Sequence, residues 1–80
     1  MERWEYAVLS FTRSHENNQA GWRIGEQGQP EQWVPNVVFR DWLNRYGLEG
    51  WELVTFTPDR YRFSGEAVAY LAVFKHRIAQ

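Results

Sequence analysis

Residues 3–12 alternate between two sets of side chains, and this period of two is typical of a β-strand. One set consists of Trp4, Tyr6 and Val8, and the other of Glu5, Ala7, Leu9 and Phe11. Because both sets are mostly apolar, we expect both faces of this strand to be at least partly covered. The pattern therefore predicts a strand in the centre of a sheet.

Residues 14–34 have a different character. A polar run at 14–19 is followed by Gly25, Gly28 and Pro30, which are typical of turns. A loop of this length without structure of its own is uncommon in a small domain. We therefore predict an inserted excursion in this segment. Its simplest form is a β-hairpin from about 20 to 34 with its turn near 26–29, and a loop is the alternative.

Apolar residues then recur at the spacing of an α-helix. Val38, Trp42 and Tyr46 stand at positions i, i+4 and i+8, with Phe39 and Leu43 beside them. This stripe predicts a helix over about 37–46, with the first three side chains toward the sheet.

The ends of the helix and the last two strands follow from local signals. Asn36 is the expected N-cap, because its side-chain oxygen can accept a free backbone N–H of the first turn. Gly47 stands where a C′ residue in the left-handed region is expected. Strand formers at 51–57 predict a second strand that Pro58 stops. A last strand over about 66–77 is again apolar on both faces.

The order strand, hairpin, helix, strand, strand predicts an α+β fold. We expect a small antiparallel or mixed sheet of three to five strands, with one helix packed on one face, in a single domain of residues 1–80. A right-handed crossover can pair the strands that flank the helix in parallel.

Composition and charge narrow the function. Nine basic and ten acidic side chains give a net charge of −1, so the chain lacks the overall positive charge that nucleic acids and anionic membranes attract. The absence of cysteine excludes disulfides, thiolate zinc sites and thiol nucleophiles. No apolar run approaches the roughly 20 residues of a membrane span, and the first five residues do not resemble a signal peptide. We expect a cytoplasmic protein.

Residues capable of catalysis are scarce and scattered. The two histidines are His15, in a polar turn, and His76, between Lys75 and Arg77. The ten carboxylates show no spacing typical of a metal or acid–base site, and no phosphate loop, nucleophile elbow or zinc motif is present. We therefore predict a non-enzymatic protein without catalytic residues, metal ligands or cofactors.

Two aromatic and basic stretches are the candidate binding residues. Trp22 and Arg23 can lie near Trp33 across the predicted hairpin. Five tryptophans exceed what one small core needs, so some belong at a surface, where Trp and Arg are enriched in interfaces. The second stretch is the connection Arg60-Tyr61-Arg62-Phe63, whose pattern is also found in single-strand binders. The alternative for this stretch is a structural connection with solvated arginines.

Three further stretches resemble a known family. They are Trp4-Glu5-Tyr6, residues 43–54 (LNRYGLEGWELV) and residues 70–76 (YLAVFKH). Together they resemble domain-of-unknown-function family 4177, which consists of small bacterial and phage proteins. Residues 14–34 depart from its pattern as a longer connection, and His76 is an extra residue in its closing motif. The resemblance implies a compact β-α-β-β domain. It carries over no catalytic residues, because the family has no established activity.

The leading hypothesis is a small binding or assembly module that acts through self-association, most simply as a two-fold dimer. A single helix can cover only one face of a sheet whose first and last strands are apolar on both. The alternative is a binder of a small anionic molecule or nucleotide at a subunit interface, like a phage protein that sequesters a signalling molecule, through Trp22, Arg23, Trp33 and Arg60 to Arg62. A weaker alternative is a binder of single-stranded nucleic acid, whose affinity would fall with salt.

Overall fold

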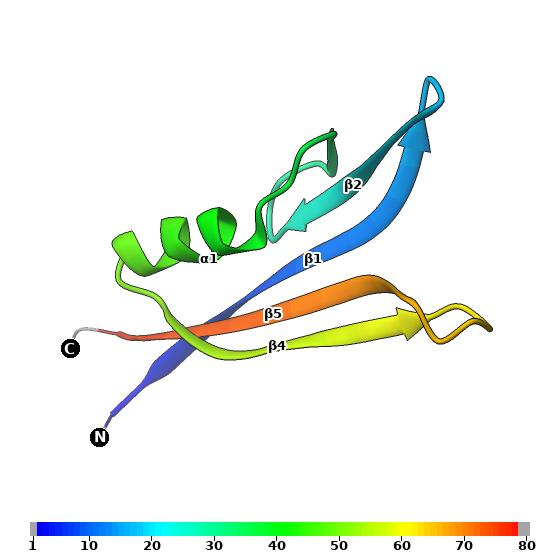
Figure 1. Cartoon of the computed structure of the whole chain (residues 1–80). Coiled ribbons are helices and arrows are strands. Elements are labelled where there is room, and N and C mark those ends of the chain that lie inside the picture. Colours follow the sequence, from blue (N-terminus) through cyan, green and yellow to red (C-terminus); the bar gives the residue numbers. More distant parts are fainter. Residues whose placement is uncertain (1, 79–80) are drawn as a thin grey trace.

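The computed structural model describes residues 2–78, which form five strands and one helix (Figure 1). In chain order the elements are β1 (Trp4–Glu16), β2 (Gln19–Glu26), β3 (Gln32–Val34), α1 (Phe39–Leu48), β4 (Glu52–Tyr61) and β5 (Ala67–Arg77). The strands make one sheet in the order β3-β2-β1-β5-β4, and every pair is antiparallel. β1 is therefore central, as its sequence predicts. In this part of the chain no helix is long and apolar enough to cross a membrane.

The predicted α+β class is wrong. The chain is mostly β, because its one sheet has five strands while helix accounts for only 13%. The physical reason lies largely in residues 14–34, which extend the sheet instead of leaving it. β1 continues to Glu16, and the following residues add β2 and β3 to one side of the sheet. The predicted parallel pairing is also absent from the described strands, since β1 and β4 both run antiparallel to β5.

Strand β4 continues through the proline that was expected to stop it. It pairs with β5 from Glu52 to Tyr61, and Pro58 lies opposite Tyr70. β4 is an edge strand of the sheet. The backbone N–H that Pro58 lacks is therefore not needed for hydrogen bonds to a further strand. Register shifts on both sides of Pro58 give the strand β-bulges. Arg60 and Tyr61 therefore belong to a strand and not to the predicted connection.

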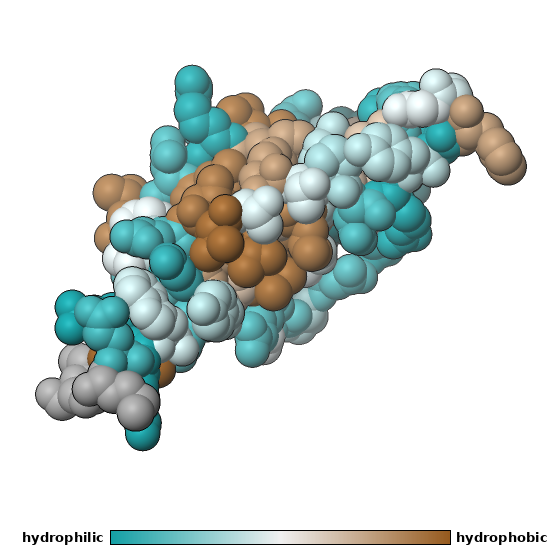
Figure 2. All heavy atoms as spheres, turned by 90° about the horizontal axis from the view of Figure 1, so that it is seen from below, coloured by the Kyte–Doolittle hydropathy of each residue, from teal (hydrophilic) through white to brown (hydrophobic). Residues whose placement is uncertain are grey.

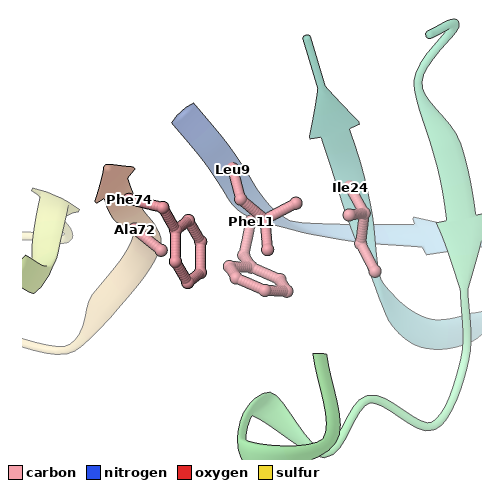
Figure 3. Packing of buried hydrophobic residues seen from close by; sticks show 5 residues of the cluster. All are labelled: Leu9, Phe11, Ile24, Ala72 and Phe74. Atoms are coloured by element: carbon pink, nitrogen blue, oxygen red, sulfur yellow. The ribbon is translucent and has the colours of Figure 1, made fainter. Parts of the chain in front are cut away.

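One face of the sheet carries the core, and we call it the closed face. Its buried cluster consists of Leu9 and Phe11 from β1, Ile24 from β2, and Ala72 and Phe74 from β5 (Figure 3). Helix α1 contributes side chains to this core without burying any of its residues completely. The Phe39 ring lies edge-on to Phe11 at 4.9 Å between centroids, and the Tyr46 ring stacks on Phe74 at 4.5 Å.

The apolar stripe of the helix begins one residue later than predicted. Trp42 and Tyr46 pack against the core as expected, but Val38 is 50% exposed and precedes the first helical turn. Phe39 takes the place assigned to Val38. Positions 39, 42, 43 and 46 form the stripe, because these spacings of three and four keep a helix face toward the sheet.

Both predicted helix caps are also wrong. The N-cap is Val38 and makes no side-chain hydrogen bond, so Asn36 has no capping role. Gly47 lies within the helix, and Gly50 has the positive φ, at 93°. The Gly50 amide donates to the Gly47 carbonyl at 3.0 Å, and the Trp51 amide donates to the Tyr46 carbonyl at 3.0 Å. These two bonds define a Schellman motif with Gly50 at C′.

The other face, which we call the open face, has no helix over it within residues 2–78. Side chains alternate along a strand, so the neighbours of the buried residues of β1 and β5 point to this face. Tyr6 and Val8 are 57% and 41% exposed there. Val73 lies opposite Val8, and Leu71 lies opposite Ser10. Tyr6, Val8, Leu71 and Val73 together form the open-face patch.

Candidate functional site

Trp22, the first candidate binding residue, belongs to the core. Its ring lies 5.2 Å from Phe39 and 5.9 Å from Tyr70 between centroids. The guanidinium of Arg13 lies 5.9 Å from the centre of the Trp22 ring. These contacts hold the half-buried indole on the closed face.

Arg23 and Trp33 lie on the other side of the same hairpin. β3 pairs Trp33 with Arg23 and Val34 with Trp22, so the two tryptophans point to opposite faces. The prediction that Trp22 and Trp33 lie near each other on one surface is therefore wrong. Arg23 is bound by the Glu16 carboxylate at 3.1 Å.

The Trp33 side chain contacts both β1 and β2 and so stabilises the position of β3. Its ring covers Gly21, where an added Cβ would lie 2.7 Å from the indole. Its Nε1–H donates to the Ser14 carbonyl at 3.2 Å. The close approach of ring and backbone requires glycine at position 21, so this glycine marks packing and not a turn.

The second candidate group lies at the opposite edge of the sheet. Arg60 and Tyr61 end β4, and Arg62 begins the turn to β5. Arg60 shares a row across the sheet with Arg23, through Ala69 and Thr12. Three strand spacings of about 4.8 Å separate their backbones. The two groups therefore stand apart on different strands, and their binding role stays a prediction.

A different group of residues lines a cleft of about 630 Å³ between α1 and the neighbouring ends of β1 and β2. Three carboxylates line it, those of Glu5, Glu26 and Glu49. Arg45, Tyr46 and Trp51 add one cation and two aromatic rings. We call it the acidic cleft.

Glu26 joins the sheet to the helix within this cleft. Its Oε1 accepts a hydrogen bond from the Tyr46 hydroxyl at 2.7 Å and another from Arg45 Nη2 at 3.0 Å. Burial raises the pKa of Tyr46 well above its ordinary value, and the hydrogen bond and negative charge of Glu26 raise this pKa further. The phenol therefore stays protonated near neutral pH and acts as a hydrogen-bond donor.

A second polar contact borders the cleft. The His76 ring nitrogen contacts the Glu5 carboxylate, which stands opposite it in the β1–β5 register. The His76 ring also lies edge-on to the Trp51 ring at 4.1 Å between centroids. Strand β5 thus brings the last histidine of the chain to the helix side of the sheet.

The chemistry of the acidic cleft suits binding. Its three carboxylates outnumber its one guanidinium, and its aromatic rings can contact a cation. Within residues 2–78 no three His, Asp or Glu side chains are placed to hold a metal ion. Sequence reasoning missed this site because Glu5, Glu26 and Glu49 are far apart in the chain. No sequence spacing connects them, and only the pairing of β1 with β2 and the docking of α1 bring them together.

The comparisons with known proteins agree with the resemblance that the sequence motifs carry. No curated protein and no solved structure matches the chain. A family model described as "Domain of unknown function (DUF4177)" matches residues 4–77, a span that contains all five strands and the helix. The chain therefore belongs to the DUF4177 family.

Proposed function

We propose that this protein is a non-enzymatic assembly module of the cytoplasm that pairs with a second copy through the open face of its sheet. The observation that carries the proposal is the exposure of Tyr6 and Val8 in the open-face patch, where Leu71 and Val73 beside them are half-buried. Tyr6 and Val8 lie on the central strand, and exposed apolar side chains gathered in that position are typical of an interaction site.

Figure 2 shows apolar residues gathered at the middle of the molecule's length, with hydrophilic residues around them and further apolar atoms at one projecting end. Val54, in a bulge of β4 opposite Val73, is 51% exposed. At one end of the open face Lys75 lies 4.4 Å from the Trp4 ring and 3.9 Å from the Glu52 carboxylate. An apolar centre with a polar rim is the usual anatomy of a protein interface.

The edges of the sheet favour pairing by faces over pairing by edges. β3 has only three residues, and β4 carries Pro58 and β-bulges. Short strands, proline and bulges are the features by which sheets avoid edge-to-edge pairing. Two open faces related by a two-fold axis present the same residues to each other and make a closed dimer.

The size of the molecule suits such a dimer. The monomer has an accessible surface of 5854 Å². A standard interface of about 800 Å² per partner would bury roughly a seventh of it.

The polar residues support a non-enzymatic role. The chain has no cysteine nucleophile, and the Tyr46 phenol, whose pKa burial raises, donates its hydrogen bond to Glu26. The hydrogen bonds of the Glu26 carboxylate come from Arg45 and Tyr46, which fix the helix to the sheet.

Sedimentation equilibrium of the full chain tests the proposal. We expect a mass near twice 9.6 kDa at micromolar concentration. Val8→Glu should weaken the dimer at least about tenfold, because a buried unpaired carboxylate costs more than 1.4 kcal/mol. Asn44→Glu adds the same charge at an exposed position of α1 and is the control. A wild-type mass of 9.6 kDa throughout would overturn the proposal.

A further inference from the structure

The end of the β4–β5 hairpin projects beyond the rest of the sheet (Figure 1). Pairing between β1 and β5 stops at Thr12 and Ala69, so the residues beyond Ala69 pair only with each other. An ion pair of 3.1 Å between Arg13 and Glu66 ties this end to β1. A two-stranded ribbon is only marginally stable without such support. The end of the β4–β5 hairpin is therefore an ordered extension of the sheet.

Aromatic and basic residues fill this extension. Phe63 is fully exposed, and Tyr61 is 62% exposed. Arg60 and Arg62 alternate with them. We call residues 60–63 the hairpin tip. A fully exposed phenylalanine at the end of a projecting hairpin contributes nothing to the core and is suited to enter a pocket on a partner.

The acidic cleft has the complementary chemistry. Its lining carries three carboxylates against one guanidinium, together with the rings of Tyr46 and Trp51. Glu26 already binds Arg45 and Tyr46, and Glu5 contacts His76, so the exposed Glu49 is the carboxylate best placed to meet an incoming guanidinium. Guanidinium groups pair with carboxylates and stack on aromatic rings. The cleft volume of about 630 Å³ falls within the range of roughly 300–1,000 Å³ that is usual for binding pockets.

The hairpin tip cannot reach the acidic cleft of its own chain. Glu5 of the cleft stands opposite His76, near the end of β5, whereas the tip adjoins Ala67 at the start of that strand. The nine residue steps from Ala67 to His76 span about 30 Å. The molecule is 49 Å long, and the two features lie toward opposite ends.

We infer that the hairpin tip of one copy docks into the acidic cleft of a second copy. This contact joins two different surfaces, so copies associate head to tail and form open chains unless the geometry closes a ring. The contact shares Tyr6 with the open-face patch, because Tyr6 also lines the acidic cleft, but its other residues lie outside the patch and it goes beyond the proposed dimer. With both contacts present, dimers become the links of a longer assembly.

An anionic membrane is a weaker match for the hairpin tip. Membrane-binding segments carry about four to eight basic residues. The tip has two arginines, and Asp59 and Glu66 stand beside them. Arg62 lies 3.9 Å from the Glu66 carboxylate. This limited charge favours an acidic protein pocket.

The test uses two variants of the full chain in a Val8→Glu background, which removes the open-face contact. The tip variant carries Arg62→Glu and Phe63→Ser, and the cleft variant carries Glu49→Lys. All three positions are exposed, so both variants should keep the unfolding temperature of the background. Failure of the proposed dimer is detected separately, in the chain that keeps Val8.

We expect the Val8→Glu chain to gain mass with concentration in sedimentation velocity. Either variant alone should associate at least about tenfold more weakly, which corresponds to 1.4 kcal/mol. An equal mixture should recover a 1:1 complex, because the intact tip of the cleft variant meets the intact cleft of the tip variant.

Three outcomes would overturn the inference. The first is a mixture that stays as monomeric as its components, and the second is a tip variant that associates as well as the background. The third is binding of the background chain to phosphatidylserine vesicles that the tip variant loses while its self-association is unchanged. That result would assign the hairpin tip to a membrane.

Discussion

On the closed face of the sheet Phe11 of β1 and Phe74 of β5 are 0% and 1% exposed, while on the open face of β1 Tyr6 and Val8 remain 57% and 41% exposed. Both faces are apolar in sequence. The difference arises because the chain has little left to cover a second face. α1 has ten residues and is about 15 Å long, whereas β1 has thirteen residues and is roughly 43 Å long. Apolar residues on a strand face therefore indicate that the face can be buried, but they do not indicate which element or partner buries it.

The largest expected effect separates the two faces directly. Phe11→Ala should lower the free energy of unfolding by about 3–5 kcal/mol, because it empties a site enclosed by Phe39, Trp42 and Phe56. Val8→Ala should cost less than about 1 kcal/mol in dilute solution, since Val8 is already 41% exposed to water. Urea unfolding at two protein concentrations measures both. Equal costs at low concentration would contradict the division into a closed and an open face.

A smaller effect concerns the turn that returns the chain from α1 to β4. Gly50→Ala should destabilise the fold by about 1–2 kcal/mol, because its φ of 93° is strained for any residue with a Cβ. Gly47→Ala is the matched control and should stabilise by about 0.5–1 kcal/mol, because Gly47 lies within the helix and no atom is within 4 Å of an added Cβ. Melting temperatures should move in opposite directions. A shift of the melting temperature in the same direction for both variants would contradict the assignment of Gly50 as the C′ residue.

The smallest expected effect is on the polar contact between the closed face and α1. Tyr46→Phe removes the hydrogen bond to Glu26 and should cost about 1 kcal/mol at pH 7. Folding raises the pKa of Tyr46, so its contribution is complete below the ordinary tyrosine pKa of 10.0 and is lost as the pH rises above that value. Wild type should therefore lose its advantage over Tyr46→Phe in alkaline solution. A difference that stays constant from pH 7 to pH 11 would contradict this account.

Local chemistry in the sequence is sufficient for several elements. The alternation of residues 3–12 correctly predicts a central strand, and the stripe of Trp42 and Tyr46 correctly predicts a helix that packs on the core. A further signal was available but misread. Asn17 and Asn18 have φ of 52° and 61° and join β1 to β2 in a two-residue turn, for which asparagine is well suited. Read in this way, residues 14–16 and 19–26 are the two arms of a first hairpin, which sequence reasoning missed. The predicted hairpin of about 20–34, with its turn near 26–29, is confirmed as the pair of β2 and β3.

By itself the sequence determined the period, the apolar content and the approximate position of most strands and of the helix, because these depend on neighbours within a few residues. Only the tertiary structure decided the rest. It placed Trp22 and Trp33 on opposite faces, brought Glu26 to Arg45 and Tyr46, and left one face of the sheet uncovered. Each of these depends on strand register or on the docking of α1. A shift of one residue in register moves a side chain to the other face, and no local pattern specifies which partner strand sets that register.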